Sequence, residues 1–278
     1  MKLLLNNSGK IIKSSSNPEI VNFYNRILAA GGTISSNSLQ AHSTFLNTLK
    51  ANNIWDKYAE IGTFAGDYNA AFVKFKYPAN IQSTLTNVGF VSSDYSESTG
   101  LAGDTSGTKY LKTGFIPKNQ LTTSLNAHFS VYSRNSMAVL GSGGSTSIRY
   151  LGSLNGGVFA LTKNSTSING SLGAGEMVVS ANGVVYPGHL MVSTVGANNG
   201  NLYYNGSSVA TDTSFSTNSL SPIENFIFAY NFSASQNVSS VCNLICAFYS
   251  FGYGLSSSEA LIFYNAVQAL QTALGRQV

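Results

Sequence analysis

Hydrophobic residues recur at helical spacing near both ends of the chain and at strand spacing in the long stretch between them. Asn17 and Pro18 are a favourable N-cap and first helical residue, and Gly31-Gly32 provides a stop about one helix length later. The apolar positions of this predicted helix share one face: Ile20, Phe23, Tyr24, Ile27 and Leu28. A second helix is predicted from Asn37 to Lys50, with an inward face of Leu39, Phe45, Leu46 and Leu49.

The closing segment predicts a buried strand followed by an amphipathic helix. An apolar run from Val241 to Phe251 is broken by Gly252 and Gly254. Ser256 and Glu259 then stand in the spacing of a capping box, and Gly275 ends the helix. The expected apolar stripe of this helix comprises Leu261, Ile262, Val267, Leu270 and Leu274.

Short strands separated by Gly, Asn and Ser clusters fill the region between residues 63 and 251. The runs 127–132, 147–151, 157–161, 178–180, 189–195 and 223–230 are the predicted strands. Asn205-Gly206 divides two further strands and supplies the two positive-φ residues of a type I′ hairpin turn. We therefore predict a mostly-β, two-sheet antiparallel jelly-roll sandwich with two N-terminal helices and one C-terminal helix.

Three regions follow from these patterns. Residues 1–16 form an N-terminal arm, residues 17–62 a helical lead-in, and residues 63–278 a β-sandwich that the C-terminal helix closes. The arm is predicted to be a hairpin whose apolar residues lie outside helices and sheets: Leu3, Leu4, Leu5, Ile11 and Ile12. Because an isolated hairpin is barely stable and its apolar edge invites pairing, we expect the arm to drive self-association, as a trimer or a surface lattice. The alternative is that the arm folds back on its own sandwich.

Composition narrows the function classes. Charged residues are 9% of the 278 residues, while hydrophobic residues reach 43% and aromatic residues 12%, so the chain is expected to fold. The net charge of +4 is thinly spread, which argues against nucleic-acid binding. No apolar run approaches the ~20 residues of a membrane span, so no membrane insertion is expected.

The two cysteines are expected to be reduced core residues. Cys242 and Cys246 are four positions apart in a predicted strand, which separates their Cα atoms by ~13 Å, beyond the reach of a disulfide. Alternation places them on the same side as Leu244 and Phe248. Neighbouring residues offer no further metal ligands.

No catalytic or cofactor motif is apparent in the sequence. The eleven acidic residues are scattered, without the paired carboxylates that glycosidases place on one strand. The clusters around Asp67 and Asp94 are more typical of Asx-turns than of calcium loops. We therefore predict that the protein is not an enzyme and holds no metal or cofactor.

Tyrosines are the remaining candidates for a binding site. Exposed Tyr rings among Asn and Ser can stack on a sugar ring or fill a protein interface, whereas buried rings with solvated hydroxyls are ordinary core residues. The candidates lie at predicted strand ends, loops or the hairpin: Tyr95, Tyr110, Tyr203, Tyr204 and Tyr253.

Both ends of the chain resemble a family. The ending Gly-Leu-Ser…Glu-Ala…Phe-Tyr-Asn-Ala-Val-Gln-Ala-Leu-Gln-Thr-Ala-Leu-Gly-Arg-Gln resembles concanavalin A-like sandwich proteins of tailed phages and prophages. The segments Ala-Gly-Gly-Thr-Ile-Ser, Leu-Lys-Ala-Asn-Asn-Ile-Trp-Asp-Lys and Ala-Phe-Val-Lys-Phe-Lys resemble the lead-in of the same group. The Leu202–Gly206 hairpin is similar to laminin-G sandwiches.

This resemblance implies a non-enzymatic virion structural protein, made in the bacterial host cytoplasm and assembled with other virion proteins in a head, tail or fibre. The alternative is a lectin-like module that recognises a glycan on the host surface.

Overall fold

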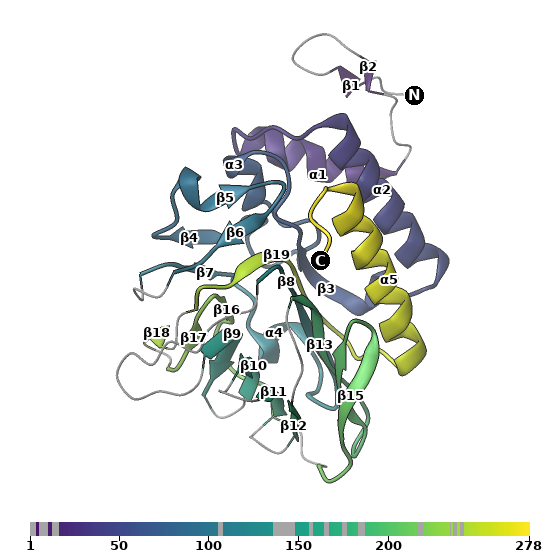
Figure 1. Ribbon diagram of the computed structural model, residues 1–278, viewed down its shortest axis with the longest axis vertical. Helices are drawn as coiled ribbons and strands as arrows, with labels where there is room; N and C mark the ends of the chain where they lie inside the picture. The colour runs from purple at the N-terminus through teal and green to yellow at the C-terminus, as the bar shows by residue number, and fades with distance from the viewer. Residues whose placement is uncertain are drawn as a thin grey trace.

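The molecule is a stack of three layers: one layer of helices and two antiparallel β-sheets (Figure 1). The computed structural model describes residues 4–5, 11–12, 17–104, 108–135, 148–155, 158–163, 167–173, 177–182, 187–215, 219–233, 235, 238–239 and 242–278. We call the sheet beneath the helices the inner sheet and the other the outer sheet. The predicted fold class, a mostly-β two-sheet sandwich with two N-terminal helices and one C-terminal helix, is confirmed.

The inner sheet has the order β15-β14-β13-β8-β19-β6-β5, and β3 also pairs with β19. Its strands are β3 (Tyr58–Gly62), β5 (Tyr95–Ser96), β6 (Gly100–Ala102), β8 (Asn126–Ser133), β13 (Gly188–Val195), β14 (Gly200–Tyr204), β15 (Ser207–Asp212) and β19 (Ile245–Gly252). Since β3 lies next to β19, the predicted helical lead-in contributes a strand to the sandwich.

The outer sheet has the order β12-β11-β10-β9-β16-β7-β4, and β17 pairs with both β9 and β18. Its strands are β4 (Thr86–Val88), β7 (Tyr110–Lys112), β9 (Ile148–Leu154), β10 (Val158–Lys163), β11 (Ser167–Gly173), β12 (Met177–Asn182), β16 (Phe226–Ile227), β17 (Tyr230–Asn231) and β18 (Val238–Ser239). The strand predicted over residues 223–230 is interrupted, because Phe228 adopts a φ of 71° between β16 and β17.

Three long helices cover the inner sheet: α1 (Pro18–Ala29), α2 (Ser36–Ala51) and α5 (Ser257–Ala273). The short helices are α3 (Tyr68–Ala71), α4 (Pro117–Gln120) and the 3-10 turns η1 (Trp55–Lys57) and η2 (Ser92–Asp94). The predicted caps are confirmed: Asn17 accepts a hydrogen bond from the Glu19 amide, and Ser256 and Glu259 form a reciprocal capping box.

The inner sheet is buried on both faces. Phe129, Val131 and Leu190 point into a core between the sheets, whereas Tyr132 and Met191 belong to a second core beneath the helices. This double burial explains why β8, β13 and β19 read as nearly continuous runs of apolar and small residues.

Two predicted side-chain directions are corrected. Leu261 was expected in the buried stripe of α5 but is 48% exposed, because the buried positions follow the spacing Phe263, Val267, Leu270. Phe248 was expected to share a side with Cys246. A register shift between these two residues in the pairing of β19 with β8 sends Phe248 to the helical core and leaves Cys246 between the sheets. Both cysteines are buried and free.

The two predicted hairpins are both present. Asn205 and Gly206 have φ values of 48° and 78°, as a type I′ turn requires. In the N-terminal arm, β1 (Leu4–Leu5) pairs with β2 (Ile11–Ile12). Leu3 lies outside the described residues.

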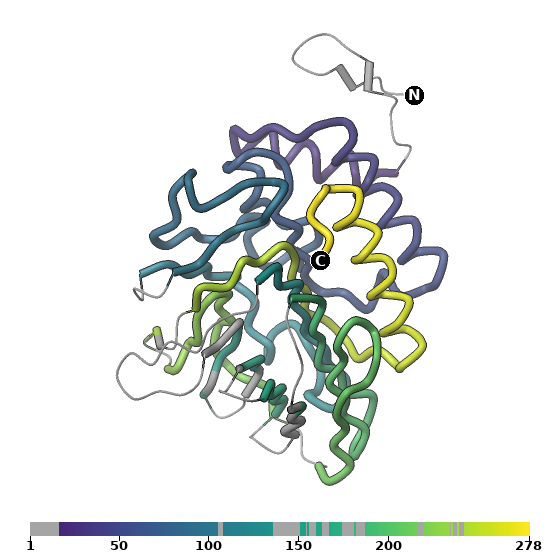
Figure 2. The backbone as a smooth tube through the Cα atoms, viewed as in Figure 1, coloured from purple at the N-terminus to yellow at the C-terminus, as the bar shows by residue number. Residues whose placement is uncertain are grey.

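The C-terminal tail returns from α5 to the inner sheet (Figure 2). Arg276 is fully buried there, and the Val278 amide donates to the Tyr132 hydroxyl at 2.9 Å. The tail therefore fixes the end of α5 against β8 and β19.

Candidate functional site

A polar cleft opens at the edge of the outer sheet, where β4 and β7 meet the turn that precedes β16. Its volume is about 290 Å³, at the lower end of the range for small-molecule sites. The lining residues are mostly polar: Ile81, Gln82, Thr84, Thr86, Lys112, Thr113, Gly114 and Glu224. The cleft therefore combines a carboxylate, an ammonium group, an amide and hydroxyls.

Glu224 is the carboxylate of this cleft and is held in place from behind. Its Oε1 accepts a hydrogen bond from the Gly114 amide at 2.5 Å. Burial raises the pKa of Glu224, and the Gly114 hydrogen bond and the charges of Lys112 and Lys74 oppose that rise. Glu224 therefore presents a carboxyl group in a fixed position, where it can form hydrogen bonds with a polar ligand.

A buried ion pair lies behind the wall of the cleft. Lys74 and Glu60 are both fully buried, and their Nζ and Oε2 atoms are 3.1 Å apart. The Tyr249 hydroxyl donates to the other Glu60 oxygen at 2.7 Å, and Lys74 also donates to the carbonyl of Thr113, a lining residue. Burial raises the pKa of Glu60, and the Lys74 charge opposes the rise. Through Lys74, this network connects the interior of the sandwich to Thr113 in the lining of the cleft.

Tyr110 lies two residues from Lys112 on β7, outside the lining of the cleft and partly buried. It shares the outer face of β7 with Lys112, because Leu111 between them is buried in the core. Two strand residues span about 7 Å, so the Tyr110 ring lies within the reach of a ligand at Lys112. The Phe226 ring supports it at 5.1 Å between ring centroids.

The other four tyrosine candidates lie elsewhere and do not form one cluster. The Tyr95 hydroxyl donates to the carbonyls of Phe64 and Gly66, both at 2.9 Å. Tyr203 is buried beneath α5, and the half-buried Tyr204 donates to the Pro187 carbonyl at 2.8 Å. Tyr253 is half-buried and offers its carbonyl to a histidine.

The three histidines are all buried between the inner sheet and the helices. His42 contacts Thr63 and the Ser38 carbonyl, and His128 contacts Ser250 and the Tyr253 carbonyl. His189 packs against aromatic rings of α5, and its Nε2 lacks a hydrogen-bond partner. Burial lowers the pKa of His42 and His128 to about 4 and that of His189 to about 3. These groups are neutral packing residues at pH 7.

The predicted acidic clusters are turns. Asp67 caps α3 and accepts hydrogen bonds from Thr33, and Asp94 closes a turn with the Val91 amide and pairs with Lys109. Over the described residues, no three His, Cys, Asp or Glu side chains gather as a metal site would require. Among the helices the structure describes, none combines the length and apolarity needed to cross a bilayer.

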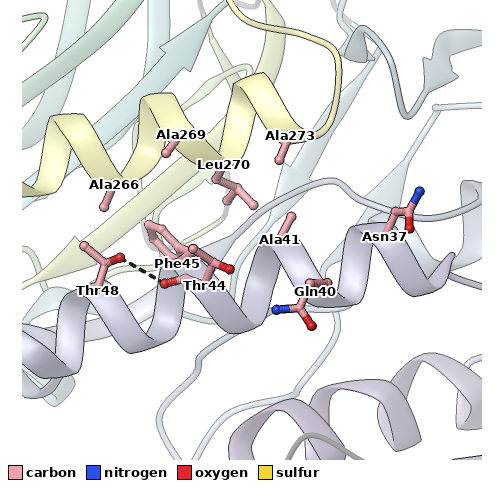
Figure 3. Close-up of a pocket in the computed structure, with 10 residues that line it drawn as sticks. All are labelled: Asn37, Gln40, Ala41, Thr44, Phe45, Thr48, Ala266, Ala269, Leu270 and Ala273. Carbon is pink, nitrogen blue, oxygen red and sulfur yellow. Dashed lines mark hydrogen bonds between the residues drawn. The ribbon is translucent and has the colours of Figure 1, made fainter. Parts of the chain in front are cut away.

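A second hollow, of about 400 Å³, separates two of the covering helices. Figure 3 shows α2 on one side and α5 on the other, with the Phe45 ring pointing toward α5. Its walls consist of small, aliphatic and uncharged polar side chains: Asn37, Gln40, Ala41, Thr44, Phe45, Thr48, Ala266, Ala269, Leu270 and Ala273. Because it lacks charge, this groove suits a protein surface better than a polar small molecule.

Sequence reasoning missed the cleft. Glu60, Lys74, Lys112 and Glu224 are far apart along the chain and carry no motif spacing. A weak signal was present in Glu60 and Lys74, which are charged residues within the largely apolar stretches 58–62 and 70–75.

Comparison with known proteins identifies the fold. No family model matches the sequence, and no curated protein matches it. Among solved structures, the HCR/D W1238A mutant is similar with a TM-score of 0.51 and 10% identity, over 76% of this chain and 52% of that chain. The receptor binding domain of botulinum neurotoxin C/D mosaic serotype has a TM-score of 0.49 and 12% identity, over 76% of this chain and 51% of that chain.

A mutant of Trypanosoma rangeli sialidase displaying trans-sialidase activity has a TM-score of 0.47 and 11% identity, over 84% of this chain and 39% of that chain. The chain thus spans about half or less of the length of these proteins. None of the three descriptions names a phage protein, so the phage origin stays a prediction. A likeness in fold at 10% identity does not by itself assign a function to the chain. The chain is a β-sandwich protein similar in fold to the HCR/D structure.

Proposed function

We propose that this protein is a carbohydrate-binding module that recognises a sugar at the cleft between β4 and β7. The observation that carries the proposal is the meeting of Glu224, Lys112 and two threonine hydroxyls in one open cleft, with the buried Lys74–Glu60 pair bonded behind it to the lining residue Thr113. A volume of about 290 Å³ accommodates about one sugar ring, with neighbouring rings extending over Tyr110.

The chemistry of the cleft matches that of a sugar. Each sugar hydroxyl both donates and accepts hydrogen bonds, so it is bound best where charged acceptors and donors stand side by side. Glu224 can accept hydrogen bonds from the sugar hydroxyls, and Lys112 can donate hydrogen bonds to them. The hydroxyls of Thr84 and Thr86 can do both. The Tyr110 ring offers an apolar face on which the C–H face of a sugar can stack.

The proposal is binding without catalysis. Hydrolysis of a glycosidic bond with retention needs two carboxyl groups about 5 Å apart that both reach the substrate. Among the described lining residues, Glu224 is the one carboxyl group, and both oxygens of the nearby Glu60 are engaged within the core.

A glycan array followed by calorimetry with the purified protein tests this function. We expect binding to one class of glycan that Glu224→Gln weakens at least tenfold, while the amide retains the bond from Gly114 and thus the fold. Asp56→Asn, an exposed carboxylate beside α2, is the matched control and should bind like the unmodified protein. Absence of binding to every glycan, equal loss in both variants, or glycan hydrolysis abolished by Glu224→Gln would each overturn the proposal.

A second candidate function is assembly into a phage particle, in line with the resemblance of both chain ends to virion proteins. The observation that favours it is the arm: among the described strands, β1 and β2 pair only with each other. An isolated two-stranded hairpin needs a partner for stability. Copurification with phage particles, lost on deletion of residues 1–16, would support this function. Recovery of both forms free of particles would exclude it.

A further inference from the structure

We propose that a second copy of this chain packs against the α2/α5 face, with its helices seated along the groove between α2 and α5. The α2/α5 face comprises the solvent-facing sides of these two helices and the groove of Figure 3. This interface goes beyond the proposed sugar site, which lies on the outer sheet, on the opposite side of the inner sheet.

The groove has the shape of a helix-packing surface. Ala266, Ala269 and Ala273 line it on α5, and the buried rings and chains of Phe45 and Leu270 form its floor. Small residues on one side leave a channel into which the side-chain ridge of another helix fits. The exposed positions Gln40 and Thr44 stand on the α2 rim and can hydrogen-bond a partner.

The α2/α5 face lacks charge, which is unusual for a helix surface that meets water. Across the 16 residues of α2 and the 17 of α5, the charged side chains are Lys50 and Glu259 at the outer ends. Each of these is paired away from the groove, Lys50 with Glu19 and Glu259 with Lys57. Solvent-facing helix sides are ordinarily charged, whereas the centres of protein interfaces are depleted of charge.

An uncharged face is suited to a copy of itself. Around a two-fold axis each residue meets its own counterparts, so any charge near the axis would face a like charge. Here the residues near the axis would be alanines, threonines and glutamine, which pack and hydrogen-bond without repulsion. Leu261, 48% exposed on α5, adds an apolar contact beside the face.

The expected affinity is modest. Two helices about 24 Å long and about 9 Å apart present on the order of 450 Å² per copy, which is below the ~800 Å² per partner of a standard interface and within the range of weak, transient ones. We therefore expect a dimer that dissociates on dilution into the micromolar range.

Light scattering across a dilution series provides the first test. The full chain should show twice its monomer mass at about 100 µM, and Ala269→Arg should weaken the dimer by at least about 100-fold, because two guanidinium groups would then face each other. Ala79→Arg places the same change on an exposed loop outside the face and should leave the dimer intact. A monomer at every concentration, or a dimer that Ala269→Arg leaves unchanged, would overturn the proposal.

A cysteine cross-link provides the second test. The native Cys242 and Cys246 are buried, and burial raises the pKa of both thiols, so an introduced thiol on the surface reacts selectively. Thr44→Cys should give a disulfide-linked dimer under mild oxidation, whereas Ala79→Cys should stay monomeric in the denaturing gel. If only deletion of residues 1–16 removes the dimer and Thr44→Cys gives no cross-link, the contact belongs to the arm and the proposal fails.

Discussion

The guanidinium group of Arg276 donates a hydrogen bond to the carbonyl oxygen of Phe64, 212 residues earlier, with 2.6 Å between Nη1 and O. Arg276 also donates to the carbonyls of Thr63, Ala247 and Glu97 and to the Gln271 amide oxygen. Burial lowers its pKa to about 10, so the group is still charged at pH 7. A buried cation is therefore stabilised by carbonyl dipoles from distant parts of the chain.

Replacing Arg276 by alanine should lower the free energy of unfolding by about 3–5 kcal/mol, because several buried carbonyls lose their donor at once. Urea denaturation followed by circular dichroism measures the change. Arg134→Ala, which removes one exposed hydrogen bond to the Ser98 carbonyl, is the control and should cost less than about 1 kcal/mol. Equal losses in the two variants would show that the buried hydrogen bonds of Arg276 contribute no more to stability than the exposed one of Arg134.

The Lys74–Glu60 pair should show strong coupling. Lys74→Met and Glu60→Gln should each lower the free energy of unfolding by about 3–5 kcal/mol, since each leaves its buried partner without a counter-charge. The double variant should cost less than the sum, because no unpaired charge remains. Additive losses in a double-mutant cycle would show that the two groups act independently.

Gly62→Ala should destabilise the protein by about 1–3 kcal/mol, because an added Cβ would lie 1.9 Å from a ring carbon of Tyr249. Moving this ring also breaks its hydrogen bond to Glu60. Combining Gly62→Ala with Tyr249→Leu should cost less than the sum of the two single changes, measured by thermal denaturation. A fully additive result would remove the steric explanation.

Stability should fall on acidification from pH 6.5 toward pH 4. Each buried histidine has a folded-state pKa below its unfolded value, so the unfolded state binds more protons in this window. Each contributes about 1.4 kcal/mol per pH unit. Above pH 4.5, the raised pKa values of Glu60 and Glu224 have the opposite effect, because the folded state then binds the additional protons. Three histidines outweigh two carboxyl groups, so the free energy of unfolding falls on acidification.

The variant His189→Phe isolates one of these groups, because phenylalanine fits among Phe248, Phe263 and Tyr264 and does not titrate. Its unfolding free energy, measured by denaturant titration between pH 4 and 6.5, should change less steeply by about 1.4 kcal/mol per pH unit. Met191→Leu, a packing change on the same strand, should leave the slope unaltered. An unchanged slope in His189→Phe would refute the assignment.

Local patterns were sufficient to predict much of the fold. Asn17-Pro18, the Ser256–Glu259 capping box and Asn205-Gly206 act within a few residues, so their consequences are visible in the sequence. Side-chain directions that depend on residues far along the chain could not be predicted in this way. The register shift that turns Phe248 away from Cys246, for example, arises from the pairing of β19 with β8. The candidate cleft was invisible for the same reason, since Lys74, Lys112 and Glu224 meet only when the sheets assemble.

The pairing of β3 with β19 also has a consequence for synthesis on the ribosome. Tyr249 follows its partner Glu60 by 189 residues, which at cellular rates of translation corresponds to about 10–40 s. During that interval the apolar faces of α1 and α2 exist without the strand and the helix that will cover them. The nascent chain is therefore expected to need shielding by a ribosome-associated chaperone until the segment from β19 to α5, made after the other strands of the sandwich, completes this core.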